Sequence, residues 1–271
     1  MASGAPPRFF FVHVMKTGGT SFVFQMTANF APAEVYPHES LDRRTPTDVE
    51  PYASVDDLER LTPQRRAEIR VYTGHLPFVA RELIGPDVVT LTLLRDPVDR
   101  TISVLKHFKR LYARYRDLPL DAIYDDDIVF PHFVQDFQTR VFALETADHP
   151  RAFAGAADYH SLRAALEGSP RSHAVLAPPI RIDAARLARA KQNLDAVDVV
   201  GVNEAFAAFV AELRQRFGWW GDAGEYDARA NVSSEPWVAT EALRARVARE
   251  STYDRALYEH ARELIAARAR W

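Results

Sequence analysis

The chain has 271 residues, of which 47% are hydrophobic and 26% are charged, and its formal net charge is −3. This composition fits one α/β domain with a sizeable core, and the slightly acidic balance argues against a general nucleic-acid binder. The chain contains no cysteine, which excludes disulfides, thiolate metal sites and cysteine nucleophiles.

The N-terminal residues Met1–Pro7 lack the basic and apolar regions of a signal peptide. No apolar run along the chain approaches the length that spans a bilayer. We therefore expect a cytoplasmic protein without a membrane span. We expect residues 1–271 to form a single domain in which residues 1–7 are flexible.

The first predicted strand is the apolar run Arg8–Val14, which ends in a turn rich in glycine and hydroxyl residues. The turn consists of Lys16, Thr17, Gly18, Gly19, Thr20 and Ser21. Because a helix-compatible stretch follows, the unpaired amides of the turn lie at the positive end of a helix dipole, a place that binds phosphate or sulfate. The two glycines let the backbone approach an anion, and Lys16 adds a positive charge. The alternative is a plain β-to-α turn with a solvated lysine. His13, inside this strand, is predicted to be a buried, hydrogen-bonded histidine rather than a base.

The order of residues in this turn differs from that of the Walker P-loop. In the Walker motif the Lys follows the glycines, and the adjacent Ser or Thr holds Mg²⁺. Here Lys16 precedes Gly18 and Gly19. The turn instead resembles the 5′-phosphosulfate loop of sulfotransferases that use 3′-phosphoadenosine 5′-phosphosulfate (PAPS). Met15 stands where that family usually has Pro, and we expect the turn to survive this change because backbone donors bind the anion.

Residues 31–68 contain five prolines and scattered charges, which predict a loop-rich excursion with short helices such as Val55–Leu61. Two interpretations stay open for this segment: a connecting loop, or a wall or lid near an acceptor site. A second strand is predicted at Arg70–Gly74, and His75 follows it directly. A neutral imidazole accepts a proton at physiological pH, so His75 is the candidate general base. The alternative is a hydrogen-bonded loop histidine.

A third buried strand is predicted at Val88–Leu94, and a helix should begin directly after Arg95. Asp96 suits the N-cap of that helix, and Pro97 suits its first position. Arg95 then lies at the carboxyl end of a strand, where its planar fork suits a phosphate, and the hydroxyl of Ser103 can reach the same group. In the other interpretation Arg95 pairs with Asp99 and Ser103 bonds back to its own helix.

The pattern Arg-Asp-Pro-x-x-Arg-x-x-Ser from Arg95 to Ser103 resembles the 3′-phosphate motif of the same sulfotransferases. Two motifs in the family's order, each at a strand-to-helix junction, make the chain similar to PAPS-dependent enzymes of the sulfotransferase 2 family, of the heparan sulfate 2-O-sulfotransferase-like, soluble bacterial type. The Gly74–His75 segment is similar to the one that carries the catalytic base in such enzymes.

The resemblance implies a P-loop-like three-layer α/β/α sandwich with a central, mainly parallel sheet. It also implies transfer of a sulfuryl group from PAPS to an acceptor hydroxyl of a carbohydrate or another small molecule, with adenosine 3′,5′-bisphosphate (PAP) as product. His75 would take the proton of the hydroxyl, and Lys16 would stabilise charge on the leaving oxygen. This scheme requires no metal, and we read the acidic run Asp125–Asp127 as a solvated turn.

The remaining segments give weaker signals. A basic stretch near His107 is either a steering surface or a solvated helix face; it comprises Lys106, Lys109, Arg110, Arg114 and Arg116. A fourth strand is predicted at Val197–Val202, followed by a helix over Glu204–Phe217 that Asn203 caps and Gly218 ends. The C-terminal helix should begin with a capping box at Ser251 and Asp254, and it carries a core-facing stripe of Leu257, Tyr258, Ala261, Leu264 and Ile265.

On resemblance alone, two further parts of the chain are assigned to the site. Asn231 and Ser233 are similar to the family's C-terminal cofactor loop, and Arg140 is placed near the acceptor. Two other function classes stay open beside the sulfotransferase. One is an ATP-dependent phosphotransferase with an atypical P-loop, against which the position of Lys16 argues. The other is a non-catalytic nucleotide-binding module, against which the Gly74–His75 segment argues.

Overall fold

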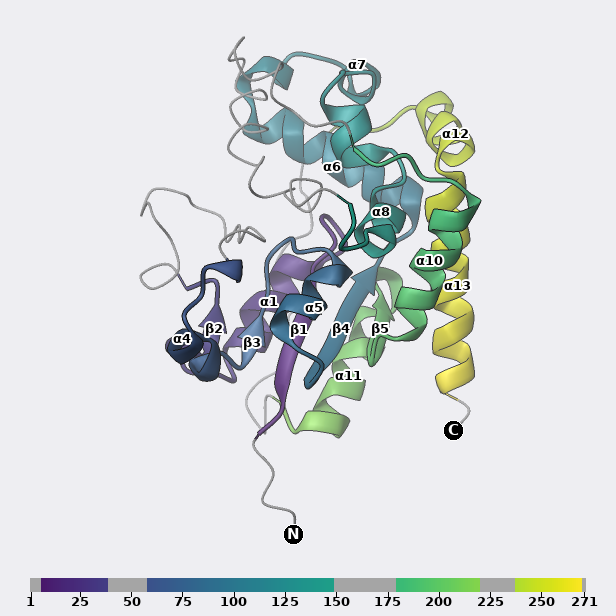
Figure 1. The fold of residues 1–271 in the computed structure, drawn as a ribbon. Helices are drawn as coiled ribbons and strands as arrows, with labels where there is room; N and C mark the ends of the chain where they lie inside the picture. Colours follow the sequence, from purple (N-terminus) through teal and green to yellow (C-terminus); the bar gives the residue numbers. More distant parts are fainter. Residues whose placement is uncertain (1–5, 39–57, 149–178, 220–236, 270–271) are drawn as a thin grey trace.

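The centre of the molecule is a five-stranded parallel sheet with the strand order β2-β3-β1-β4-β5 (Figure 1). The computed structural model describes residues 6–38, 58–148, 179–219 and 237–269. The strands are β1 Arg8–Val12, β2 Val35–Tyr36, β3 Val71–Tyr72, β4 Val88–Leu94 and β5 Val199–Val202. The predicted α/β class with a parallel central sheet is confirmed.

The four predicted strands are all present, and the short strand β2 is an addition. The bounds of β4 agree with the prediction, whereas β1, β3 and β5 are shorter than their apolar runs. β2 lies inside the proline-rich segment that we expected to be loop, and it pairs with β3 at the edge of the sheet. The same segment contains the 3-10 turn Pro32–Glu34 and the helix α4 (Pro63–Glu68). Of the predicted helix Val55–Leu61, the first three residues lie outside the described ranges.

Helices cover both faces of the sheet, which gives three layers. Alternate side chains of β1 explain this, because Phe9 and Phe11 enter one apolar cluster while Phe10 and Val12 enter another. On the Phe9 side lie α1 (Gly19–Thr27) and α11 (Phe206–Phe217). On the Phe10 side lie α5 (Arg81–Ile84), α8 (Phe137–Ala143), α10 (Ala184–Asp195) and α13 (Thr252–Arg268).

A third apolar cluster involves the turn after β1 and the segments that follow β4. It is formed around α6 (Pro97–Leu111), α7 (Leu120–Tyr124) and α12 (Glu241–Glu250), together with the π-helical turn Phe130–Val134, and Met15 contributes to it. Figure 1 shows α6 beyond the carboxyl end of β4, across the top of the sheet. The cluster therefore packs one side of the predicted anion-binding turn.

The start of α6 confirms the predicted helix signal. The side chain of Asp96 accepts hydrogen bonds from the amides of Val98 and Asp99, both at 3.0 Å, and Pro97 occupies the first helical position. Arg95 is consequently the last residue before the helix. Asp99 pairs with Arg244 at 2.8 Å, so the alternative pairing of Arg95 with Asp99 is not the arrangement seen.

The predicted capping box of the C-terminal helix is wrong. Ser251 precedes α13 but makes no side-chain cap, and the carboxylate of Asp254 points to a different helix. It accepts hydrogen bonds from the amides of Gln138 and Thr139, at 3.2 and 2.7 Å, in the first turn of α8. Asp254 is only 2% exposed, and its carboxylate is used in this contact between α13 and α8. It therefore does not cap the N-terminus of α13.

The predicted role of Asn203 as a helix cap is also wrong. Residues Asn203–Ala205 form a 3-10 turn, α11 begins at Phe206, and no side chain caps it. Gly218 ends α11 in the left-handed conformation, as predicted. The C-terminal stripe packs in the core: Leu257, Tyr258 and Ala261 are buried, and Leu264 and Ile265 pack against them. None of the helices in the described ranges is both long enough and apolar enough to cross a membrane.

Candidate functional site

Three of the predicted site elements follow neighbouring strands at the carboxyl end of the sheet. β1 lies between β3 and β4, and all three strands run parallel. The chain passes from β1 toward β2 and β3 on one side and then returns to β4 on the other. Ligands of such sheets bind beyond the carboxyl ends of the strands where the strand order reverses. The Lys16 turn, His75 and Arg95 follow the three strands at this place.

The turn after β1 has four consecutive carbonyl groups that each accept a hydrogen bond from a side chain. The pairs are Thr17 Oγ1 to Val14 O at 2.9 Å, Arg100 Nε to Met15 O at 3.1 Å, Arg95 Nη1 to Lys16 O at 3.3 Å and Asn203 Nδ2 to Thr17 O at 3.0 Å. We call this set the carbonyl clamp. In a trans peptide the C=O and the following N–H point in opposite directions, so the clamp directs the amides of residues 15–18 away from its donors. This arrangement suits an anion.

Two residues of the turn adopt a left-handed backbone. Gly18 has φ +92° and precedes α1, and Lys16 has φ +66°. The conformation has no steric cost for Gly18, whereas for Lys16 it costs on the order of 1 kcal/mol, a kind of strain found at binding sites. The first turn of α1 carries no acidic residue, so nothing of the helix itself neutralises its positive end.

The hydroxyl residues of the predicted loop are placed differently from one another. Thr17 is fully buried and its hydroxyl bonds within the clamp, which leaves its backbone amide as the group it can offer to a ligand. Thr20 is exposed and Ser21 is partly exposed, both in the first turn of α1. Ser103 is partly exposed two turns into α6. Asn231 and Ser233 lie outside the described residues.

His75 meets His13 beyond the ends of β3 and β1. Phe10 pairs with Tyr72 in the sheet, and both histidines come three residues later, so the register brings them together. Their ring centroids are 4.3 Å apart, and His75 Nδ1 lies 2.9 Å from the carbonyl oxygen of His13. A carbonyl only accepts, so Nδ1 carries the proton and Nε2 of the neutral ring carries the lone pair. His75 thus presents the form that a general base requires.

The electrostatics of the turn keep both histidines neutral. Burial lowers the pKa of His75, Lys16 and Arg100 lower it further, and the bond to the His13 carbonyl opposes them. Burial, His75 and Lys16 hold the pKa of His13 well below 6.5. His13 is 7% exposed, as predicted for a buried histidine, but it lies just beyond β1, where its ring stacks on Phe11 and packs at a tilt against His75. Its ring also packs on Gly19, where a Cβ atom would overlap it.

Arg95 is held by its backbone and by its Nη1, and its Nε is the side-chain atom left for a ligand. The amide of Gln138 donates to Arg95 O at 2.9 Å and accepts from Arg95 N at 3.0 Å, and Gln138 is fully buried. The backbone amide of the next residue, Asp96, donates a hydrogen bond to the Glu204 carboxylate at 3.0 Å. Arg95 Nε is buried without a hydrogen-bond partner among the described residues. A buried guanidinium N–H without a partner fits an anionic ligand.

Sequence reasoning missed the residues that support the turn. Arg100 is fully buried, and its Nη2 donates to Phe133 O at 2.7 Å. Burial lowers the pKa of Arg100 to about 10. The middle Arg of the second motif was its only signal in the sequence. The sequence did not connect Asn203 and Gln138 with the turn, because their partners Thr17 and Arg95 are 186 and 43 residues away.

Other polar groups that drew attention in the sequence have structural partners. Asp125 pairs with Arg246, and Asp126 pairs with Arg114 and caps the backbone at Ile128 and Val129. In the part of the chain that the structure describes, no group of three His, Asp or Glu residues is placed to hold a metal ion. Lys109 does not lie on a solvated basic face, because it is 8% exposed and donates to Arg116 O at 2.7 Å.

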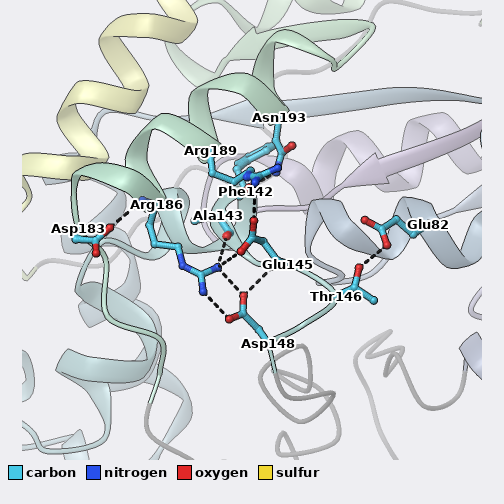
Figure 2. A network of polar contacts seen from close by, with 10 residues as sticks. All are labelled: Glu82, Phe142, Ala143, Glu145, Thr146, Asp148, Asp183, Arg186, Arg189 and Asn193. Carbon is cyan, nitrogen blue, oxygen red and sulfur yellow. Dashed lines mark hydrogen bonds and ion pairs between the residues drawn. The ribbon is translucent and has the colours of Figure 1, made fainter.

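A second polar cluster joins the end of α8 to α10 (Figure 2). Arg186 lies at its centre and pairs with Asp148 at 2.6 Å and Glu145 at 3.4 Å, while Arg189 pairs with Glu145 at 2.8 Å. A cavity of about 720 Å³ opens beside this cluster and is lined in part by Arg189 and Thr146. Since its central charges are matched in pairs, we assign the cluster to the packing of α8 against α10.

Arg140 lies beside a different cavity, and its guanidinium shares the ring of Phe137 with that of Arg100. It lines a space of about 350 Å³ with Asp136, Tyr253 and Arg181. Burial lowers the pKa of Arg140 to about 10 and raises that of Asp136 to about 6. The predicted role of Arg140 at the acceptor stays a prediction.

No protein-family model matches the chain, and a search of curated proteins finds no match.

Proposed function

We propose that the protein is a sulfotransferase that moves a sulfuryl group from PAPS to an acceptor hydroxyl. The observation that carries the proposal is the junction of three strand ends. An anion-binding turn with Lys16, a phosphate-binding candidate at Arg95 and a neutral histidine at position 75 lie together at the edge where parallel sheets bind ligands. The resemblance of both motifs to the sulfotransferase 2 family supports the same conclusion.

The residues present fit the two charged ends of PAPS. The outward amides of the Lys16 turn and the start of α1 would hold the 5′-phosphosulfate, and Arg95 with Ser103 would hold the 3′-phosphate. Asn231 and Ser233 are carried over from the family for the nucleotide. The buried N–H of Arg95 without a protein partner supports this assignment. PAPS supplies an activated sulfuryl group on an anhydride oxygen.

The chain's own residues would supply the proton transfer and the charge. His75 Nε2 takes the proton of the acceptor hydroxyl, since its Nδ1 is fixed as the donor to His13 O. Lys16 stabilises negative charge on the bridging oxygen as it leaves, an interaction that is stronger in the transition state than in the ground state. The scheme needs no metal. The acceptor is a small molecule or a carbohydrate that carries a hydroxyl.

The two other function classes fit these observations less well. An ATP-dependent phosphotransferase would use a Lys after the glycines and a hydroxyl for Mg²⁺. In this chain Lys16 comes first, and the Thr17 hydroxyl is occupied by Val14 O. A non-catalytic nucleotide-binding module would not need a histidine whose lone pair is fixed at Nε2.

Calorimetric titration with PAP, compared with ATP in the presence of Mg²⁺, tests the proposal most directly. We expect micromolar binding of PAP without metal and no binding of ATP. The PAP titration should be unaffected by a chelator. Preference for Mg-ATP would overturn the sulfotransferase and favour a phosphotransferase, and failure to bind either nucleotide would overturn both.

Replacement of Arg95 tests the 3′-phosphate assignment separately. Arg95→Ala removes a charge-assisted contact that contributes about 1.5–3 kcal/mol, so PAP affinity should fall about ten- to a hundredfold. Adenosine 5′-phosphosulfate, which lacks the 3′-phosphate, should lose less affinity than PAP does, and the loss that remains reports the contact of Arg95 Nη1 with Lys16 O in the carbonyl clamp. Arg189→Ala, which removes an arginine from the α8–α10 cluster, is the matched control and should leave PAP affinity unchanged. Unchanged affinity in Arg95→Ala would remove Arg95 from the site.

A further inference from the structure

The cavity beside Arg140 lies between three parts of the fold. It has a volume of about 350 Å³ and is lined by residues of the segment 131–140, by residues 179–182 and by Tyr253 of α13. This volume lies at the lower end of the range for ligand pockets, which suits a small molecule. The wall carries both charged and apolar side chains, which include Asp136, Arg140, Arg181, Pro131, Ile180 and Ile182.

Asp136 occupies the N-cap position of α8 without capping it. Its side chain makes no cap, and the amides of Gln138 and Thr139 donate to Asp254 of α13 instead. Asp136 is 7% exposed, and its Oδ1 is buried without a hydrogen-bond partner among the described residues. A buried carboxylate oxygen of this kind costs free energy, which a ligand that donates a hydrogen bond to it would recover.

Arg140 lies one helical turn further on and carries the opposite charge. Its backbone amide donates to Asp136 O at 2.9 Å, and its Nη2 donates to Gln135 O. Its Nε is buried and, like Asp136 Oδ1, has no hydrogen-bond partner in the part of the chain that the structure describes. These two atoms therefore do not bind each other. The same cavity is thus lined by a cationic donor and an anionic acceptor that the described protein groups do not satisfy.

The two opposite charges select a ligand that carries both. An inorganic anion would satisfy Arg140 alone, and a simple amine would satisfy Asp136 alone. An α-amino acid has an ammonium and a carboxylate on one carbon, so it can present both to side chains that are one helical turn apart. Arg181 adds a positive charge for the carboxylate, and Ile180 and Ile182 offer apolar surface to an aliphatic side chain.

We propose that this cavity binds an α-amino acid with an aliphatic side chain. Its ammonium donates to Asp136 Oδ1, its carboxylate accepts from Arg140 Nε, and its side chain packs on Ile180 and Ile182. The inference is independent of the proposed sulfuryl transfer, because an aliphatic amino acid has no acceptor hydroxyl. Its test accordingly uses no nucleotide.

Calorimetry with L-leucine and two of its analogues tests both charges on the parent protein. 4-Methylpentanoate is leucine without the ammonium, and 3-methylbutylamine is leucine without the carboxylate. At about pH 7 amines are protonated. Burial and the charge of Asp254 raise the pKa of Asp136 to about 6, so its carboxylate is mostly ionised there. We expect leucine to bind with a Kd between about 10 μM and 1 mM, and each analogue to bind at least about tenfold more weakly, since each lacks one charge-assisted hydrogen bond.

Two variants assign the charges to their residues. Asp136→Asn keeps the shape of the side chain and removes its charge, so it should weaken leucine binding at least about tenfold and abolish the preference for leucine over 4-methylpentanoate. Arg140→Gln should abolish the preference for leucine over 3-methylbutylamine. Asp125→Asn removes a carboxylate that pairs with Arg246 outside the cavity, and it is the matched control that should leave leucine binding unchanged.

Three results would each overturn the inference. One is the absence of binding when leucine, isoleucine and valine are titrated at millimolar concentration. Another is equal binding of leucine and either analogue, which would show that the cavity does not read both charges. The third is unchanged leucine affinity in Asp136→Asn and Arg140→Gln, which would place the amino acid elsewhere. The comparison of analogues needs no variant, so it decides the question even if a substitution prevents folding.

Discussion

Replacing His75 with Ala should abolish turnover while PAP still binds. Removal of a general base lowers rates about 10²–10⁴-fold, and His75 is the residue whose lone pair is fixed at Nε2 beside the Lys16 turn. PAP carries no group that reacts with the base, so its affinity should change little. Turnover is measured as release of PAP from PAPS with a hydroxyl acceptor that the parent protein accepts, and binding is measured by calorimetry on the same samples.

A pH profile and a surface control sharpen this result. His75 must be neutral to act, and its pKa in the folded protein lies below 6.5 because of burial and the nearby cations. Activity of the parent protein should therefore hold as pH falls to 6.5 and decline only at lower pH. His260 on α13 pairs with Asp195 on α10 at 2.7 Å. The control variant His260→Ala should leave turnover unchanged. Normal activity in His75→Ala would remove it as the base.

Replacing Gly19 with Ala should abolish nucleotide binding by deforming the turn. An added Cβ would overlap the ring of His13, which is itself held between Phe11 and His75. The turn must then move, and its amides lose their common direction. Overpacking of this kind costs about 1–3 kcal/mol, and the loss of several amide donors adds to it, so PAP affinity should fall about a hundredfold or more.

A second glycine separates binding from stability. Gly218 ends α11 with φ +66° and has open space where a Cβ would lie. Gly218→Ala should lower the free energy of unfolding by about 1 kcal/mol and leave PAP affinity intact. Thermal melts and calorimetry on both variants would distinguish the two effects. If Gly19→Ala binds PAP as tightly as the parent protein, the turn is not the nucleotide site.

Much of the sheet and part of the site could be predicted from local signals. The apolar run Val88–Leu94 is bounded by turn residues and by the Asp96-Pro97 helix start, and both of its ends were placed correctly. Lys16, His75 and Arg95 were chosen as site candidates because each follows an apolar run directly, and their roles stay predictions. β2 was missed since a strand of two residues, Val35 and Tyr36, is too short to show a period.

The errors concern side chains that can cap a helix but bind elsewhere. Asn203 and Asp254 stand at positions where short polar residues usually satisfy local amides. In the fold, Asn203 donates to Thr17 O and Asp254 accepts from the start of α8. Sequence spacing shows only which nearby backbone groups a side chain can bind. It does not show a partner that is distant in the sequence and that the side chain binds instead. The pairing of His13 with His75 likewise depends on strand register, which follows from tertiary structure.

The composition of the carbonyl clamp has a consequence for the order in which the protein becomes functional. Its donors come from residues 17, 95, 100 and 203, so the turn after β1 is completed only once the chain has been made through Asn203. A nascent chain that ends before β5 and Asn203 has the motif without its full scaffold. Domains are synthesised from the N-terminus at about 5–20 residues per second, so affinity for the nucleotide should arise only after Asn203 has been added and β5 has joined the sheet. Nucleotide capture by ribosome-bound chains of increasing length would report this step.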